Sequence, residues 1–179
     1  MLISNMKFSR VWAMPSADTF SIPPIRDFVT KYLHGVSVDP FARNSGLATY
    51  TNDLSKETSA QYHMLADDFL TMLAGQNVKA DVVIFDPPYS PGQIVECYQS
   101  CGLEVGIKSG QNGALYKSAR TAIRNLCKHG TIVLSFGWNS CGMGDGFELV
   151  EVMLVAHGGA HNDTICIAER MVQEQIGLI

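Results

Sequence analysis

The sequence predicts an α/β protein built around a mostly parallel sheet, and three observations lead to this prediction. Residues 82–85 and 130–136 are short runs of almost uninterrupted apolar residues, which is typical of strands buried on both faces. Segments with apolar residues at helical spacing alternate with such runs along the chain, as in β/α folds. Of the 179 residues, 46% are hydrophobic and 17% are charged, which are values of a globular protein.

The elements are predicted in order from spacing and from helix-breaking residues. We expect residues 10–20 to form a loop, because Pro15, Ser16 and Asp18 interrupt them. A helix over residues 24–33 follows, with Ile25 and Phe28 on its apolar side and a proline in its first turn, where no N–H is needed. The remaining predictions are strands at 36–39 and 49–54, helices at 55–65 and from 66, a strand at 82–85, helices at 91–101 and 115–128, and strands at 130–136, 147–156 and 163–170.

A stiff loop follows the apolar run at residues 82–85. The strand has to end at Asp86, because Pro87 and Pro88 have a fixed φ and no N–H. The loop therefore stands at the carboxyl end of a sheet strand, where open α/β sheets bind ligands. Its carboxylate, its proline carbonyls and the ring of Tyr89 suit an exocyclic amine on a flat base. The alternative is an ordinary β–α loop in which Asp86 caps a helix and Tyr89 packs.

The sequence Asp86-Pro87-Pro88-Tyr89 after a hydrophobic strand resembles motif IV of the amino-methyltransferases, which methylate exocyclic amines of nucleobases. This resemblance implies a class I methyltransferase fold, a Rossmann-like three-layer sandwich with a mostly parallel seven-stranded sheet and an antiparallel strand near the C-terminus. It also implies S-adenosylmethionine as cofactor and Asp86, Pro87, Pro88 and Tyr89 as catalytic residues. The motif is most similar to that of enzymes that methylate adenine N6 in DNA, with the base flipped out. Guanine N2 or adenine N6 in RNA is the alternative substrate.

Three further stretches resemble cofactor-binding motifs of this family. Residues 19–25 are similar to motif X, residues 39–46 to motif I and residues 66–70 to motif III, whose acid contacts the cofactor's adenine. An ordinary capped helix is the alternative at both 19–25 and 66–70. Asp53, at the tip of the second β-prone stretch of this α/β pattern, also lies where nucleotide-binding α/β folds hold ribose hydroxyls. The expected cofactor-binding residues are Thr19, Phe20, Ser21, Asp39, Pro40, Phe41, Asp53, Leu54, Asp67 and Asp68.

The chain departs from motif I, which usually reads Asp-Pro-Phe-x-Gly-x-Gly. Arg43 stands at the position of the first glycine, and only glycine adopts a positive φ without penalty. We expect Asn44 to tolerate the left-handed conformation and Gly46 to shift the turn. The departure also motivates a different class of function, a catalytically weak methyltransferase-like subunit that binds nucleic acid or a partner.

The charge distribution gives a prediction for a nucleic-acid face. The net charge of −4 does not favour binding to phosphates, but basic residues cluster between 108 and 128. Lys117, Arg120 and Arg124 are three and four residues apart and share one side of a predicted helix. The expected nucleic-acid-binding residues are Lys108, Lys117, Arg120 and Arg124. A solvated helix face is the alternative.

The whole chain, residues 1–179, is expected to be one domain by its length. The stretch between Tyr89 and Gly130 falls short of the roughly 50 residues that a target-recognition domain requires. Target recognition is therefore expected from loops, a second copy of the chain or a partner. The five cysteines form no C-x-x-C pair, so we expect reduced thiols, a cytoplasmic protein and no bound metal. No apolar run is long enough to span a membrane.

Overall fold

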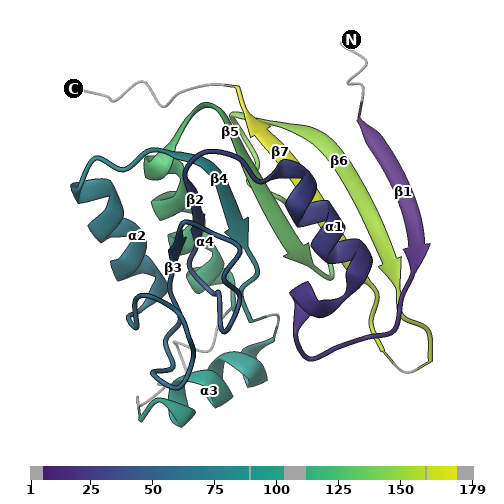
Figure 1. Ribbon diagram of the computed structural model, residues 1–179, viewed down its shortest axis with the longest axis horizontal. Helices are drawn as coiled ribbons and strands as arrows, with labels where there is room; N and C mark the ends of the chain where they lie inside the picture. Colours follow the sequence, from purple (N-terminus) through teal and green to yellow (C-terminus); the bar gives the residue numbers. More distant parts are fainter. Residues whose placement is uncertain (1–5, 89, 103–111, 160, 173–179) are drawn as a thin grey trace.

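The computed structural model describes residues 6–88, 90–102, 112–159 and 161–172 (Figure 1). The helices are η1 (Thr19–Ser21, a 3₁₀ turn), α1 (Pro23–Tyr32), α2 (Ala66–Gly75), α3 (Pro91–Ser100) and α4 (Asn112–Leu126). The strands are β1 (Lys7–Trp12), β2 (Ser37–Asp39), β3 (Tyr50–Thr51), β4 (Ala80–Phe85), β5 (Cys127–Gly137), β6 (Phe147–Ala156) and β7 (Thr164–Met171).

The strands form one sheet in the order β1-β6-β7-β5-β4-β2-β3. All strand pairs are parallel except those that involve β7, which is antiparallel to both β5 and β6. The prediction of a mostly parallel seven-stranded sheet with an antiparallel strand near the C-terminus is confirmed. Because the other six strands run in the same direction, their carboxyl ends meet at one edge of the sheet, which we call the carboxyl edge.

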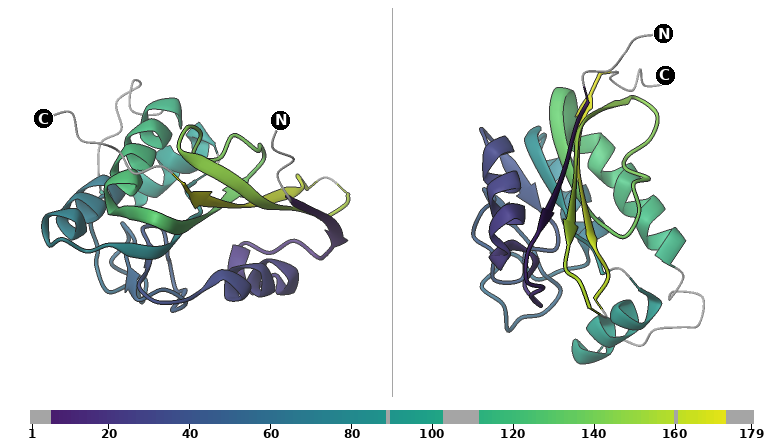
Figure 2. Two further views of the ribbon diagram at one scale, coloured as in Figure 1. Left: turned by 90° about the horizontal axis from the view of Figure 1, so that it is seen from above. Right: turned by 90° about the vertical axis from the view of Figure 1, so that its right-hand side faces the viewer.

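Helices cover both faces of the sheet, with α1 on one side and α4 on the other (Figure 2). The side chains of β4 alternate between the two layers, as strand geometry requires. Val82 and Ile84 join the apolar cluster beneath α1, whereas Val83 and Phe85 join the cluster that includes α2 and α4. The predicted inward residues of α1, Ile25 and Phe28, are buried in the first of these clusters. The strand is therefore buried on both faces, as its apolar sequence predicted.

The loop prediction for residues 10–20 is wrong at its start, because Lys7–Trp12 forms β1 at the edge of the sheet. This strand pairs in parallel with β6, from Lys7 opposite Glu151 to Trp12 opposite Ala156. Val11 packs on the cluster beneath α1, while Phe8 and Trp12 are exposed. Large apolar side chains on the exposed face obscure the usual alternation of a half-buried strand.

The helix predicted over residues 55–65 is also wrong, because this segment consists of turns and of one extended stretch beside β3. Tyr62 bridges to Asn52 in parallel, and its N–H donates to the carbonyl of Thr51 at 3.1 Å. The side chain of Asn52 then accepts from the N–H of Met64 at 3.1 Å. These sheet-like bonds use the backbone groups that a helix would have paired internally.

Residues 138–146 connect the parallel strands β5 and β6 without a helix. They are held by two side chains: Glu169, which accepts from the N–H of Met143 at 2.7 Å, and Arg124, which donates to the carbonyls of Met143 and Asp145. Gly142 has a positive φ of 50°, and a Cβ there would come 2.4 Å from the Glu169 carboxylate. The positive φ and the close approach of Glu169 both favour glycine at this position. None of the described helices is both long and apolar enough to cross a membrane.

Candidate cofactor and base site

A cavity of about 520 Å³ opens at the carboxyl edge of the sheet, beside β4, β2 and β3. Five segments line it: the loop after β4, the turn after β2, the segment after β3, α3, and the stretch at residues 17–19. This is the place predicted for a ligand, at the carboxyl ends of parallel strands. Its size is that of a small-molecule site. Of the predicted residues, those on its wall are Thr19, Pro40, Phe41, Asp53, Leu54, Asp86, Pro87 and Pro88.

The loop after β4 presents Asp86 to this cavity. Ser90 is the N-cap of α3, because its hydroxyl accepts from the N–H of Gln93 at 3.2 Å. The alternative interpretation of the sequence, in which Asp86 caps this helix, is therefore wrong. Tyr89 lies outside the described residues, so its predicted stacking role stays a prediction.

Tyr116 of α4 holds the loop from the opposite side. Its hydroxyl donates to the carbonyl of Pro88 at 2.9 Å, and its ring meets Phe85 edge-on at 6.1 Å between centroids. Burial, together with the charge of Asp86, raises the pKa of the Tyr116 phenol. The phenol thus stays protonated and keeps donating to the loop at neutral pH.

In the turn after β2, Arg43 occupies the position at which motif I usually has glycine. Arg43 itself adopts the left-handed conformation, with a φ of +49°, although glycine takes it at lower cost. Its N–H donates to Asp53 at 3.1 Å, and its guanidinium donates to the carbonyl of Ala17 at 2.7 Å. The expectation that Asn44 or Gly46 would take over the strained position is wrong.

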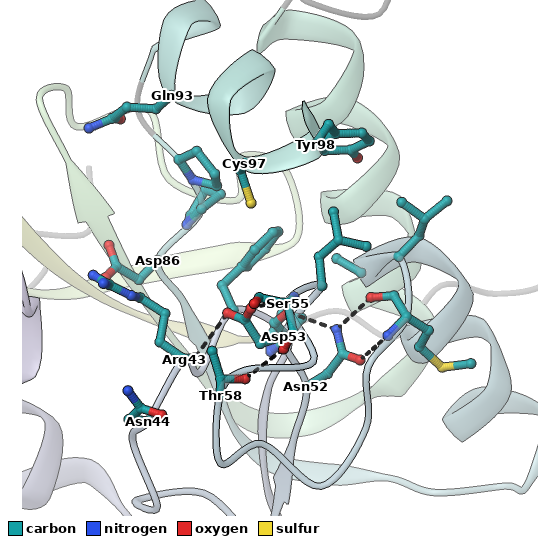
Figure 3. A pocket seen from close by; sticks show the side chains of 18 of the residues that line it. Arg43, Asn44, Asn52, Asp53, Ser55, Thr58, Asp86, Gln93, Cys97 and Tyr98 are labelled. Carbon is teal, nitrogen blue, oxygen red and sulfur yellow. Dashed lines mark hydrogen bonds between the residues drawn. The ribbon is translucent and has the colours of Figure 1, made fainter. Parts of the chain in front are cut away.

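Asp53 stands at the centre of this arrangement, in the segment that follows β3 (Figure 3). One carboxylate oxygen accepts from Arg43, and the other accepts from the N–H of Ser55 at 2.8 Å. Both donors belong to segments that line the cavity. The carboxylate therefore fixes two walls of the cavity and also faces it.

Asn52 is a structural residue of the site that the sequence did not reveal. Its buried amide group donates to the carbonyls of Pro40 and Met64, at 3.1 and 3.0 Å. It thereby ties the turn after β2 to the segment before α2. The only signal in the sequence was a polar residue at the end of a β-prone stretch, which is too common to assign a role.

Helix α3 supplies the remaining wall, which the sequence analysis also missed. Gln93, Cys97 and Tyr98 lie across the cavity from Asp53 and Arg43 (Figure 3). Burial, and then the charge of Asp53, raises the pKa of the Cys97 thiol. The thiol is consequently protonated at neutral pH and acts as a small apolar surface.

Asp39 lies beneath the cavity rather than on its wall. It is fully buried, one oxygen accepts from the N–H of Phe41 at 3.0 Å, and the other has no partner among the described residues. Burial raises the pKa of this carboxyl well above its ordinary value, and the charges of Asp86 and Asp53 add to the effect. The four predicted cofactor residues that also do not line the cavity are Phe20, Ser21, Asp67 and Asp68.

These four residues have other contacts. Phe20 is buried and meets Phe136 edge-on at 5.4 Å, and the Ser21 hydroxyl bonds to Ser16 and to the carbonyl of Asp18. Asp67 and Asp68 lie in the first turn of α2, where Asp67 accepts from Ser118 of α4. The cavity is instead lined by the preceding residues Met64, Leu65 and Ala66.

The basic residues of α4 differ in their surroundings. Lys117 is exposed, but Arg124 is used by the connection at residues 138–146 and lies over the ring of Phe147 at 5.0 Å. Arg120 lies over the ring of Tyr116 and lines a smaller cavity of about 90 Å³ with Trp138 and Asn139. Lys108 lies outside the described residues.

The loop after β6 has a structural role. His157 is buried, and its ring nitrogens lie 2.9 Å from the carbonyl of Ala13 and 2.9 Å from the hydroxyl of Thr164. In the described part of the chain, no group of three His, Cys, Asp or Glu residues is placed to hold a metal ion. All five cysteines are free thiols.

Comparison with known proteins identifies the fold. No protein-family model matches the sequence, and no curated protein matches it. The structure is similar to TrmN from Thermus thermophilus, with a TM-score of 0.55 and 17% identity over 84% of this chain and 49% of that chain. It is similar to yhhF from Escherichia coli, to which methyltransferase activity is ascribed, with a TM-score of 0.52 and 11% identity over 89% of this chain and 92% of that chain.

A protein from Streptococcus mutans, to which SAM-dependent methyltransferase activity is ascribed, is a third similar structure. Its TM-score is 0.50, with 10% identity over 82% of this chain and 48% of that chain. The chain thus spans about half the length of TrmN and of the Streptococcus mutans protein. Together with the order of the strands, these similarities show that the chain has the class I methyltransferase fold.

Proposed function

We propose that the protein is an S-adenosylmethionine-dependent methyltransferase that acts on the N6 amine of adenine in DNA. The observation that carries the proposal is that Asp86, Pro87 and Pro88 stand on the wall of the same cavity as Asp53. The first three are the residues that resemble motif IV, and the fourth is the predicted ribose-binding acid. A methyl donor and an amine have to meet at one place, and this cavity offers groups for both.

The lining of the cavity fits S-adenosylmethionine. Leu54, Met64 and Leu65 offer an apolar surface for the adenine ring, and Asp53 offers carboxylate oxygens for ribose hydroxyls. Arg43 and Thr19, which also line the cavity, are suited to the polar methionine end of the cofactor. Bound there, the cofactor supplies the methyl group. The similarity to the Streptococcus mutans protein supports the same choice of cofactor.

Asp86 and the proline carbonyls are suited to hold the amine. The Pro88 carbonyl accepts from Tyr116, so we assign the Asp86 carboxylate and the Pro87 carbonyl as acceptors for the two amine hydrogens. Two acceptors orient the nitrogen lone pair toward the methyl donor, and the two prolines restrict the backbone of the loop that carries them. Tyr116 anchors the loop in this conformation.

The choice of adenine in DNA rests on the resemblance of residues 86–89 to that branch of the amino-methyltransferases. A base in a duplex has to be flipped out at a cost of a few kcal/mol, and stacking on an aromatic ring, at roughly 1–3 kcal/mol per base, offsets part of this cost. Tyr89 is the residue proposed for stacking.

The test is to incubate the full chain with methyl-labelled S-adenosylmethionine and either DNA or RNA, and to identify the labelled nucleoside after digestion. We expect N6-methyldeoxyadenosine from DNA. Label in N2-methylguanosine or in N6-methyladenosine from RNA alone would transfer the proposal to an RNA substrate. Binding of the cofactor without transfer to either polymer would favour the methyltransferase-like binding subunit.

A further inference from the structure

An apolar surface with a basic residue at its centre lies on the edge strand β1, outside the cavity already described. Phe8 and Trp12 are 65% and 63% exposed, and Arg10 between them is also exposed. Because alternate residues of a strand share a face, these three side chains stand in a row on one side of β1. We call this row the β1 face. Met14 continues it beyond the strand and is 68% exposed.

The row faces away from α1. Val11, the intervening residue, packs on the cluster beneath α1, so the β1 face lies on the opposite side of the sheet. Its neighbours on β6 are Val152, Leu154 and Ala156, which pair with Phe8, Arg10 and Trp12. β1 and β6 lie at the end of the sheet farthest from α2 (Figure 1). A surface of this kind, with large exposed apolar side chains, marks an interaction site.

The loop after β6 lies beside the Trp12 ring. A Cβ added at Gly158, in the loop after β6, would come 3.4 Å from Trp12 Nε1, so the loop lies against the indole edge. The strand neighbour of Trp12 is the small side chain of Ala156. The indole thus has the loop at one edge while most of its surface stays open. This is the arrangement of a stacking platform.

Local charge indicates an anionic partner. The protein as a whole is acidic, with a net charge of −4, but its first acidic residue is Asp18. Arg10 therefore gives the β1 face a positive charge within an acidic chain, whereas Lys7 lies on the opposite face, near Glu151. Aromatic rings interleaved with a basic residue are what proteins use to bind single-stranded nucleic acid, because bases stack on rings and phosphates pair with the cation.

The β1 face also reaches the edge where the reaction would occur. Trp12 ends β1 at the carboxyl edge, the edge at which Asp86 follows β4. Between β1 and β4 lie β6, β7 and β5, so the two residues are separated by four strand spacings, roughly 20 Å. About six stacked nucleotides at roughly 3.4 Å each cover this distance.

We propose that Phe8, Arg10 and Trp12 bind an unpaired stretch of the nucleic acid whose base enters the site at Asp86. The two rings stack on bases, and the guanidinium of Arg10 contacts a phosphate. This proposal rests on the proposed function, since it assigns the surface to the substrate of that reaction. The proposal places the main nucleic-acid contact on β1 rather than on α4. On α4, Arg124 already donates to the carbonyls of residues 143 and 145.

The test measures binding of a fluorescently labelled 12-nucleotide single-stranded DNA to the full chain by anisotropy at several salt concentrations. The variants are Trp12→Ala and Arg10→Gln, with Lys7→Gln as the matched control. Lys7 lies on the same strand and is exposed, but its side chain is on the opposite face, near Glu151. Thermal unfolding of each variant reports on the fold.

We expect Trp12→Ala to weaken binding about tenfold or more, in the range of losing one stacked base. Arg10→Gln should weaken binding and reduce the slope of affinity against salt by about one, whereas Lys7→Gln should keep the wild-type slope. Equal effects of Arg10→Gln and Lys7→Gln would overturn the proposal, because they would indicate general charge rather than a face. Unchanged binding by folded Trp12→Ala, or no binding by the wild type, would also overturn it.

Two controls separate this proposal from others. If light scattering shows a dimer that Trp12→Ala converts to a monomer while DNA binding persists, the β1 face is a contact between copies and the proposal fails. If the wild type transfers methyl groups and all variants keep its KM for DNA, the role of the β1 face is contradicted. The proposed activity is not affected by that result. Conversely, the expected binding pattern without any methyl transfer would count against the proposed activity and leave the binding face in place.

Discussion

The N–H of Arg43 donates to the carboxylate of Asp53 at 3.1 Å, and this bond joins the turn after β2 to the end of β3. Arg43 adopts a φ of +49° to make it. The glycine usual at this position in motif I would reach that conformation more easily, so arginine adopts it at a cost in backbone strain. The guanidinium contributes a second bond, to the carbonyl of Ala17, which glycine could not make.

Substitution of Arg43 should separate these two contributions. Arg43→Ala and Arg43→Gly both lose the bond to Ala17, but only glycine also relieves the left-handed conformation. We expect Arg43→Gly to be more stable than Arg43→Ala by about 1 kcal/mol in urea unfolding. Equal free energies of unfolding would show that the positive φ is not strained in this turn.

Removal of the Asp53 carboxylate should weaken the cofactor site. Asp53→Ala leaves the N–H groups of Arg43 and Ser55 without their acceptor and removes the oxygens assigned to the ribose. We expect S-adenosylmethionine binding, measured by calorimetric titration, to weaken by about 1–3 kcal/mol. Asp53→Asn keeps one oxygen and should lose less. An affinity unchanged in Asp53→Ala would remove Asp53 from the cofactor site.

The buried carboxyl of Asp39 should make stability depend on pH. Its folded-state pKa is raised, chiefly by burial, so its contribution to stability is fully present below the unfolded pKa of about 4 and is lost as pH rises toward the folded pKa. Asp39→Asn has a similar shape and cannot ionise. We therefore expect the free energy of unfolding of the wild type to fall relative to Asp39→Asn between pH 4 and pH 7. A constant difference over this range would mean that Asp39 does not titrate on unfolding.

Arg124 should prove to be a stabilising residue rather than a phosphate contact. Arg124→Ala loses charge-assisted bonds to two carbonyls and the contact with Phe147, so we expect a loss of about 1–3 kcal/mol in the free energy of unfolding. Lys117→Ala, on the exposed side of the same helix, should change stability by less than about 0.5 kcal/mol. If Arg124→Ala instead weakens DNA binding and leaves stability intact, the predicted nucleic-acid face on α4 is restored.

The central strands were predictable because they consist of short, nearly uninterrupted apolar runs, which indicate burial on both faces. The run at residues 82–85 needs no knowledge of the rest of the chain to be identified as a buried strand, and the two prolines fix where it ends. The same local logic placed Asp86 at the carboxyl edge. The stretch predicted as a strand over 49–54 is a strand only at Tyr50–Thr51, and Asp53 follows it. Residues 147–156, predicted as a strand, are the observed bounds of β6.

The features that could not be predicted depend on partners far away in the sequence. β1 is a strand because it pairs with β6, and its exposed Phe8 and Trp12 contradict the usual pattern of apolar residues facing inward. The role of Asn52 arises when its amide group meets the carbonyls of Pro40 and Met64. The wall formed by Cys97 depends on where α3 is placed, which no local spacing encodes.

The most direct test of the account is methyl transfer by Asp86→Ala. The measurement is the rate of label transfer from S-adenosylmethionine to adenine-containing DNA, with cofactor affinity determined by calorimetry on the same preparations. Because Asp86 is assigned to the amine and Asp53 to the cofactor, we expect the rate to fall about 100-fold or more while the affinity stays within a few-fold of wild type. Asp86→Asn, which keeps an acceptor oxygen, should retain more activity than Asp86→Ala. Equal rates for wild type and Asp86→Ala would contradict the assignment of the reaction to this loop.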